Sequence, residues 1–179
     1  MKYRLIAIEG VDGTGKTTIT QSLVKEYNGK YFYNPPVIIR FMKYFMDRHA
    51  SIKVRYLYYL IGNWISSFTL PFYLRNSMVF CDWYYFSTIV YHSVLMKKNL
   101  KEPNLLKPDT IIYLSADWKT IKERLDKREY KSKYENLKFL KEVDVKYREM
   151  LKYFTSVIYI DTSSGETQMI VEKIKRELN

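Results

Sequence analysis

A glycine-rich turn close to the start of the chain holds the residue types best suited to chemistry. Residues 10–18 read Gly-Val-Asp-Gly-Thr-Gly-Lys-Thr-Thr and come directly after a short apolar run. Within them, Gly10, Gly15, Lys16 and Thr17 match the G-x-x-x-x-G-K-[S/T] pattern of a phosphate-binding loop. Glycines let successive backbone N–H groups face a single anion, and the helix that follows adds the positive end of its dipole. The pattern therefore predicts a site for the phosphates of a nucleoside triphosphate.

Two side chains of this turn have predicted roles. Lys16 is expected to reach the β- and γ-phosphates, and the Thr17 hydroxyl is expected to ligate Mg²⁺, a hard cation that prefers oxygen. The alternative is a glycine-rich turn that caps a helix and binds nothing. The Gly-Lys-Thr ending disfavours that alternative, because a simple turn has no need of it.

Two acids lie close to the predicted loop. Asp82 follows a short apolar run at residues 78–81, and a carboxylate at the tip of a strand beside the loop suits Mg²⁺ or its water shell. Its alternative role is the N-cap of a helix that begins near Tyr85, since Asp is a favoured cap. Glu9 is either a second group near the metal or a strand-end acid hydrogen-bonded to backbone.

The elements that must position these residues alternate along the chain. Expected strands occupy residues 5–9, 30–33, 78–81, 110–114 and 157–160. Expected helices occupy residues 17–27, 53–72, 85–97, 118–127, 137–154 and 167–178. This alternation predicts an α/β fold with a parallel sheet covered on both faces. Ligands of such sheets lie beyond the carboxyl ends of the strands, where Gly10, Asp82 and Asp161 all fall.

Length and composition limit which classes of protein this chain can belong to. The 179 residues are 47% apolar and 27% charged, which predicts one globular domain over residues 1–179. Cys81 is the only cysteine, so no intrachain disulfide is possible and a reducing compartment is expected. The first four residues lead straight into the first strand, so we expect no signal peptide and a cytoplasmic protein. A net charge of +11 suits polyanionic ligands but by itself says nothing about catalysis.

An uncharged segment at residues 56–74 approaches the length of a membrane span. Polar residues interrupt it, and the apolar side chains recur at helical spacing: Val54, Leu57, Ile61, Trp64, Ile65 and Phe68. We therefore expect a largely buried helix that is half covered by a partner subunit, and no membrane association.

A dense basic run at residues 124–133 lies between two expected helices. Such a run is either a solvated surface or a lid. Phosphoryl transfer favours the lid, because its transition state needs positive charge from outside the phosphate loop and because a lid excludes water. The lid is expected over about residues 124–135.

Residues 6–18 resemble the opening of the thymidylate kinases, which are members of the nucleoside monophosphate kinase family. Residues 79–84 are similar to the strand that ends in Asp-Arg-Tyr in that family, and Tyr91-His92 stands where a Tyr-Gln pair usually follows. Residues 114–128 resemble the fourth strand, the next helix and the entry to the lid. The resemblance thus covers nearly the whole chain and is most specific in the phosphate loop.

This resemblance implies a fold and a reaction. The fold is the three-layer P-loop kinase fold, an α/β fold with a five-stranded parallel sheet, helices on both faces and a short basic lid. The reaction is transfer of a phosphoryl group from ATP, with Mg²⁺, to dTMP in a homodimer. Positioning and charge carry such a transfer, so no strong general base is needed. The donor-binding residues carried over are Gly10, Asp12, Gly13, Thr14, Gly15, Lys16, Thr17 and Thr18, with Thr17 and Asp82 as metal ligands.

The family pattern also implies catalytic residues. Asp12 matches the loop acid that contacts the acceptor sugar. Thr14 replaces an arginine that some members carry in the loop, so the catalytic cation is expected in the lid. Its candidates, in order, are Arg124, Arg128, Lys131 and Lys133. The implied catalytic set is Lys16, Arg124, Arg128 and Asp82, and residues 162–164 match a region near the adenine base.

The acceptor side departs from the family. Trp83 stands in place of an arginine, and the loop at residues 33–36 reads Tyr-Asn-Pro-Pro in place of Arg-Glu-Pro-Gly. Tyr59 and Asn63 align with an aromatic residue over the base and with an arginine four positions on. Three cationic contacts to the acceptor are therefore missing or moved. The expected substrate-binding residues are Asp12, Tyr59, Asn63, Trp83, Tyr91 and His92.

The missing cations leave three hypotheses open. In the first, Arg40, Arg55 or Arg75 takes over the acceptor phosphate, in a dTMP kinase or in a kinase for another nucleotide or nucleoside. In the second, the chain is an ATP-binding regulator that has lost catalysis. In the third, the basic surface binds nucleic acid; this ranks last because the aromatic residues follow helical core spacing.

Overall fold

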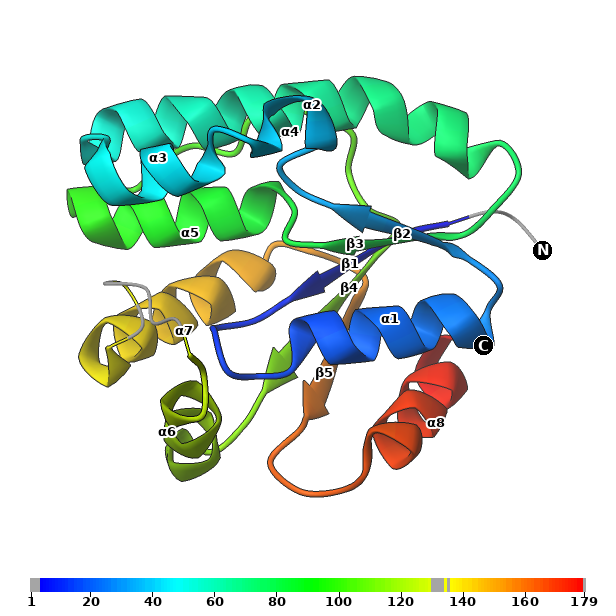
Figure 1. Cartoon of the computed structure of the whole chain (residues 1–179). Helices are drawn as coiled ribbons and strands as arrows, with labels where there is room; N and C mark the ends of the chain where they lie inside the picture. Colours follow the sequence, from blue (N-terminus) through cyan, green and yellow to red (C-terminus); the bar gives the residue numbers. More distant parts are fainter. Residues whose placement is uncertain (1–3, 130–133, 135, 179) are drawn as a thin grey trace.

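The computed structural model describes residues 4–129, 134 and 136–178. Five strands form one parallel sheet in the order β2–β3–β1–β4–β5 (Figure 1). They are β1 (Leu5–Glu9), β2 (Lys30–Tyr33), β3 (Val79–Asp82), β4 (Thr110–Ser115) and β5 (Val157–Asp161). The predicted α/β fold with a five-stranded parallel sheet is confirmed.

Helices cover both faces of the sheet, with α4 and α5 on one side and α1 and α8 on the other (Figure 1). The long helices are α1 (Lys16–Glu26), α4 (Ile52–Leu74), α5 (Tyr85–Met96), α7 (Leu137–Leu151) and α8 (Thr167–Leu178). Leu5 and Ala7 of β1 pack with α4, α5 and α7, whereas Ile6 and Ile8 pack with α1 and α8. A strand with two covered faces reads as a continuous apolar run, as β1 does.

Strand register brings the phosphate loop next to Asp82. Ile8 pairs with Asp82 across β1 and β3, so the two strands end at the same edge of the sheet. Asp82 is the last residue of β3 rather than the first residue after it, and the N-cap of α5 is Tyr84. The loop and the carboxylate therefore come from neighbouring strand ends.

Two short helices were not predicted, α2 (Val37–Arg40) and α3 (Lys43–His49). Neither contains a fully buried residue, so neither carries the apolar stripe from which helices are recognised. Hydrogen bonds tie them to α4: the hydroxyl of Tyr58 donates to the carbonyl of Ile39, and that of Tyr59 donates to Asp47. Of the two, α3 lines the site described below. The remaining helix, α6 (Trp118–Asp126), follows β4.

Helix α4 is half buried rather than largely buried. Its inner face buries Tyr58, Tyr59, Gly62, Asn63, Ser66 and Leu70. Its outer face exposes Val54, Leu57, Ile61, Trp64, Phe68 and Phe72, which recur at helical spacing. Among the described residues, no helix is long and apolar enough to cross a membrane.

Candidate active site

The phosphate loop joins β1 to α1 through a backbone that only glycine adopts easily. Gly10, Gly13 and Gly15 have φ values of 143°, 91° and 85°, in the region that L side chains rarely occupy. A Cβ at Gly10 would lie 2.3 Å from the carbonyl oxygen of Leu114. Gly15 precedes the first residue of α1, so the loop opens onto the N-terminal end of that helix, where backbone N–H groups favour anions.

Lys16 lies across the loop that contains it. Its ammonium group donates to the carbonyl oxygens of Gly10 at 2.8 Å and Val11 at 2.9 Å, and lies 3.6 Å from the carboxylate of Asp12. The ring centroid of Trp83 lies 5.8 Å from the same ammonium group. The ammonium charge of Lys16 is thus held against the loop itself, as expected of a phosphate-binding lysine.

Thr17 and Asp82 form a site that suits a hard cation. The Thr17 hydroxyl donates to Oδ2 of Asp82 at 2.7 Å, and the Tyr31 hydroxyl donates to the same oxygen at 3.1 Å. The other oxygen, Oδ1, is buried without a hydrogen-bond partner among the described residues. A buried carboxylate oxygen needs a donor or a cation, so the unpartnered Oδ1 beside Thr17 fits Mg²⁺.

This site would not hold a metal by protein ligands alone. In the part of the chain that the structure describes, no group of three or more His, Cys, Asp or Glu residues could bind an ion. Mg²⁺ commonly binds through one or two protein oxygens, phosphate oxygens and water, so the donor set present here fits a metal that arrives with a nucleotide.

Glu9 lies beneath the loop and has protein partners on both oxygens. Its carboxylate accepts hydrogen bonds from the Tyr84 N–H at 3.1 Å, the Ser87 hydroxyl at 2.5 Å and the Tyr147 hydroxyl at 2.9 Å. Burial raises its pKa to about 7, although these donors and Lys16 act in the opposite direction. Of the two sequence-based alternatives, the geometry matches the strand-end acid that is hydrogen-bonded to backbone.

A cavity of about 610 Å³, called the large cavity below, opens beside the phosphate loop and is walled by α3, α4 and α5. It brings together five of the six expected substrate residues: Asp12, Tyr59, Trp83, Tyr91 and His92. Their aromatic rings form one wall, with centroids 6.5 Å apart for Tyr59 and Trp83 and 5.0 Å apart for Trp83 and Tyr91. The Tyr91 hydroxyl donates to Asp12 at 3.1 Å. Flat apolar walls with polar groups between them suit a nucleotide base and sugar.

Asn63, the sixth expected substrate residue, does not line this cavity. Its side chain is fully buried, accepts a hydrogen bond from Asn34 and donates to the Thr88 hydroxyl at 3.0 Å. Ser66 donates to the same Asn34 at 2.8 Å. These bonds tie the loop after β2 to α4 and α5, so Asn63 holds the wall of the cavity together.

Three cations reach the large cavity from α3 and α4: Lys43, Arg48 and Arg55. Only Arg55 was among the candidates for the acceptor phosphate. Arg40 donates instead to the backbone carbonyls of Pro35 and Tyr33, and Arg75, at the far end of α4, lies over the ring of Phe72.

Sequence reasoning missed Lys43 and Arg48 because α3 itself was missed. The one signal for it was the spacing of Lys43 and Asp47, which are four residues apart and form an ion pair on one helical face.

A second cavity of about 360 Å³, called the small cavity, lies on the other side of the loop. Thr18 and the predicted lid residues Arg124 and Arg128 line it, together with Thr162 from the expected adenine region. Arg124 donates to the carbonyls of Gly13 at 3.2 Å and Thr162 at 2.6 Å, so it braces the loop against the segment after β5. The other two lid candidates, Lys131 and Lys133, lie outside the described residues.

The loop is closed on this side by Thr14. Its buried hydroxyl donates to the Val11 carbonyl at 2.8 Å, and its own carbonyl accepts from the Thr162 hydroxyl at 3.0 Å. Thr14 therefore acts within the loop and supplies no cation.

The fold and the site together define a class of protein, the P-loop nucleotide kinases. The features of that class present here are a parallel sheet, a glycine loop with an adjacent lysine, and a threonine–aspartate pair. Comparison with known proteins is more specific. The family model described as thymidylate kinase matches residues 8–174, and this chain belongs to that family. Membership makes it a thymidylate kinase-like phosphotransferase that uses ATP.

Relatives align over most of their length. A probable thymidylate kinase of Methanocaldococcus jannaschii is 28% identical over 97% of this chain and 92% of its own. One from Staphylothermus marinus is 31% identical over 96% of this chain and 94% of its own.

Two solved structures share the fold. Thymidylate kinase from Candida albicans has a TM-score of 0.79 at 19% identity, with 98% of this chain and 90% of that one covered. Deoxyadenosine kinase from M. mycoides has a TM-score of 0.73 at 23% identity, with both chains covered in full.

Proposed function

We propose that this chain transfers the terminal phosphoryl group of ATP, bound with Mg²⁺, to dTMP and releases ADP and dTDP. The observation that carries the proposal is the meeting of the two cavities at the phosphate loop, where Gly13, Gly15, Thr18 and Arg128 line both. In-line transfer needs the attacking and leaving oxygens on opposite sides of one phosphorus atom. A donor base in the small cavity and an acceptor in the large cavity meet that requirement.

The transfer itself needs positioning and charge. Lys16 binds the donor phosphates, and Thr17 and Asp82 hold Mg²⁺, which neutralises charge on the donor oxygens when it is bound. An oxygen of the acceptor phosphate attacks the γ-phosphorus; a P–O bond forms, and the bond to the β–γ bridging oxygen breaks. That oxygen is already anionic near neutral pH, so no side chain has to remove a proton. Arg128 supplies positive charge where the cavities meet, and Arg124 holds the loop in place.

The acceptor is held by groups from three helices. Tyr59 and Trp83 flank its base, and Asp12 with Tyr91 binds its sugar. Lys43 takes the acceptor phosphate, because it lines the large cavity and is close enough to Asp12, in the phosphate loop, to interact with it electrostatically. This assignment replaces the hypothesis that Arg40 or Arg75 does so, since both side chains are engaged outside the cavity.

The proposal extends to organisation and location. Residues 1–179 act as one kinase domain with a lid at about residues 124–135, of which residues 130–133 and 135 lie outside the part of the chain that the structure describes. A cytoplasmic location agrees with ATP as donor and with a single buried cysteine, Cys81. Neither nucleic acid nor a membrane is a partner.

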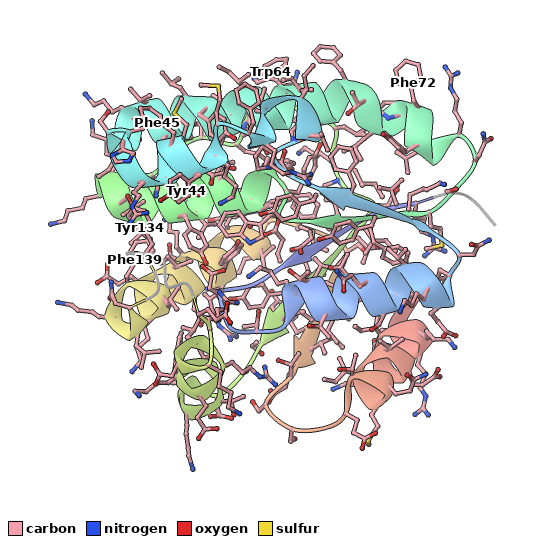
Figure 2. All side chains as sticks on the ribbon, viewed as in Figure 1. Tyr44, Phe45, Trp64, Phe72, Tyr134 and Phe139 are labelled. Atoms are coloured by element: carbon pink, nitrogen blue, oxygen red, sulfur yellow. The ribbon has the colours of Figure 1, made fainter. Side chains whose placement is uncertain are left out.

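A homodimer is proposed from the outer face of α4. Further exposed apolar side chains lie on α2 and α3 and at the end of α2: Val37, Ile38, Phe41 and Phe45. Figure 2 shows Trp64 and Phe72 on the side of α4 away from the sheet. Exposed apolar side chains on neighbouring helices favour burial against a second copy. Trp64→Glu with Phe68→Glu should give a monomer by light scattering, whereas a wild-type chain that is already monomeric would contradict the dimer.

The function is tested with purified protein, Mg·ATP and a panel of acceptors: dTMP, dUMP, dCMP, dAMP, dGMP and thymidine. We expect dTMP to have the highest kcat/KM. Transfer to thymidine in preference to every monophosphate would replace the proposal with a nucleoside kinase. Binding of ATP without transfer to any acceptor would support the regulator.

A further inference from the structure

Trp83 has a backbone conformation that large side chains rarely adopt. Its φ is 64°, in the left-handed region. In the described part of the chain, the other non-glycine residues with positive φ are Asn28 and Lys97. Both stand where a helix ends, α1 for Asn28 and α5 for Lys97, and a left-handed residue is common there. Trp83 lies instead between the end of β3 and the start of α5, so no helix C-terminus accounts for its conformation.

The peptide groups on both sides of Trp83 are held by hydrogen bonds. On one side, the carbonyl of Asp82 accepts from the N–H of Asn34 at 3.3 Å. On the other side, the N–H of Tyr84 donates to Oε1 of Glu9 at 3.1 Å. A large residue keeps a strained conformation only where its surroundings fix it. These two hydrogen bonds fix the turn from the β2 side and from the β1 side.

Glu9 holds the second of these peptide groups and is itself held by two helices. It is fully buried, and it is not among the residues that line either cavity. Its Oε2 accepts from the hydroxyls of Ser87 on α5 and Tyr147 on α7. Those two hydroxyl oxygens lie 2.7 Å from each other, so the three oxygens form a closed cluster. Glu9 therefore ties the turn at Trp83 to α5 and α7 without facing a substrate.

The conformation of Trp83 determines where its ring lies. The ring lines the large cavity, and its centroid lies 5.8 Å from the ammonium group of Lys16 and 5.0 Å from the ring of Tyr91. Because φ sets the direction in which the side chain leaves the backbone, a turn that relaxed to negative φ would carry the ring away from this position. The shape of the large cavity beside Lys16 thus depends on the turn.

We propose that Glu9 is a positioning residue for phosphoryl transfer: its Oε1 holds Trp83 in the left-handed turn that places the ring beside Lys16, and its Oε2 makes that turn depend on Tyr147 of α7. This inference rests on the proposed function and adds the group that sets the shape of its acceptor site. The role needs a hydrogen-bond acceptor at Oε1 and a polar group at Oε2. It needs no negative charge, which separates it from the role of a general base or a metal ligand.

The first experiment replaces Glu9 in two ways. Glu9→Gln keeps a carbonyl oxygen for the Tyr84 N–H. Its amide N–H groups can donate to Ser87 and Tyr147, whose hydroxyls accept as well as donate, so kcat/KM should stay within about threefold of wild type. Glu9→Ala leaves the buried Tyr84 N–H without a partner. Its kcat/KM should fall at least about 30-fold, with KM raised for the acceptor and unchanged for ATP.

The comparison of these two variants is decisive. A loss as large in Glu9→Gln as in Glu9→Ala would overturn the inference, because Glu9 would then act through its charge. The control is Glu142→Ala, an exposed acid on α7, which should stay within twofold of wild type.

Tyr147→Phe removes a single oxygen and tests the link to α7. It takes away one of the two donors to Oε2, so kcat/KM for the acceptor should fall about fivefold while KM for ATP stays the same. The control is Tyr153→Phe, just beyond the end of α7, where the side chain is 89% exposed and wild-type kinetics are expected. Tyr147→Phe also decides the question if Glu9→Ala does not fold. Wild-type kinetics in Tyr147→Phe would contradict the dependence on α7.

A pair of substitutions measures the strain itself. Trp83→Gly and Trp83→Ala both remove the ring, but glycine alone adopts a positive φ at no steric cost. The equilibrium constant for unfolding should therefore be about fivefold larger in Trp83→Ala than in Trp83→Gly. When Glu9→Ala is added to each, the turn can relax and the excess should disappear. Equal constants in the two variants with Glu9 in place would overturn the inference.

The fluorescence of Trp83 separates this inference from the proposed function. The chain has three tryptophans, so Trp64→Phe with Trp118→Phe leaves Trp83 alone. In that background Glu9→Ala should change the emission spectrum of Trp83, whereas Glu9→Gln should not. If no acceptor receives a phosphoryl group, the proposed function fails, and this spectrum still tests the hold of Glu9 on the turn. An unchanged spectrum in Glu9→Ala would overturn the inference even if transfer to dTMP is efficient.

Discussion

The two sides of the phosphate loop are built in different ways. The donor side uses backbone N–H groups and short side chains from one continuous segment, residues 10–18, braced by Arg124 and Thr162. The acceptor side uses side chains that come from the loop itself, from α3, α4 and α5 and from Tyr134. The donor side is a local structure, whereas the acceptor side is assembled from residues that lie up to more than a hundred positions apart in the sequence.

This difference gives a physical reason for the departures that the family resemblance predicts on the acceptor side. Backbone amides bind phosphate whatever the neighbouring side chains are, so a loop of fixed spacing is sufficient. Side-chain contacts can be rebuilt from another turn of a helix. Trp83 stands where the family resemblance predicts an arginine, Asn63 lies in the wall, and Arg55, two turns before Asn63 on α4, lines the cavity. The geometry of the donor side is thus set by a local sequence motif, whereas the geometry of the acceptor side is set by the packing of helices.

The largest effect should follow from removing the charge on the donor side. Lys16→Ala should lower kcat on the order of 10³-fold, because a preorganised cation at the transferred group is lost. Circular dichroism should show an intact fold. The control is Lys25→Ala, an exposed lysine on the same helix, which should keep wild-type activity. Wild-type turnover in Lys16→Ala would remove the basis for the assigned donor site.

Next in size is the effect of the acid beneath the donor loop. Because burial raises the pKa of Glu9 to about 7, the folded state holds its proton more tightly than the unfolded chain does. The contribution of Glu9 to the free energy of unfolding is fully present below about pH 4.5 and is lost as the pH rises to about 7. Glu9→Gln stays neutral, so its stability relative to wild type should rise by up to about 3 kcal/mol between pH 4.5 and pH 8.

Denaturant unfolding of both proteins across that range measures the difference. Parallel pH profiles would show that Glu9 titrates alike in the folded and unfolded states. Such a result would contradict the raised pKa of Glu9 in the folded protein.

A smaller effect is expected on the acceptor side. Lys43→Met should raise KM for the acceptor about 20-fold with KM for ATP unchanged, since a hydrogen bond to a charged group contributes about 1.5–3 kcal/mol. Lys53→Met, an exposed lysine at the start of α4, is the control and should behave as wild type. Steady-state kinetics with each substrate varied in turn provide the measurement. An equal rise in both KM values would show that the two sides of the loop are not separable.

The smallest effect concerns the hydroxyl that positions Asp82. Tyr31→Phe removes one of two donors to Oδ2, and the neutral hydrogen bond lost contributes about 1 kcal/mol. The Mg²⁺ concentration for half-maximal ADP binding should therefore rise about fivefold, measured by calorimetry. Tyr159→Phe, on the opposite edge of the sheet, should leave it unchanged. If ADP binding weakens equally with and without Mg²⁺, Tyr31 supports the fold rather than the metal site.

Particular residues show how far the sequence could be interpreted. Gly10, Lys16 and Thr17 were placed correctly in one loop because their spacing is local and its geometry is set by φ angles that glycine permits. Asp82 was placed beside that loop because parallel strands end at one edge of a sheet. Lys43 and Arg48 were missed because α3 is held to α4 by a hydrogen bond from Tyr59 to Asp47 rather than by an apolar stripe.

The sequence by itself determined the phosphate loop, the alternation of the five strands with the longer helices and a parallel sheet covered on both faces, because these depend on spacing along the chain. Only the tertiary structure decided which side chains meet in the large cavity, that Asn63 turns into the wall and that Arg55 reaches the cavity from α4. The physical reason is that backbone geometry and hydrophobic period are properties of neighbouring residues. The partners of a buried polar group, by contrast, are set by the packing of helices that are distant in sequence.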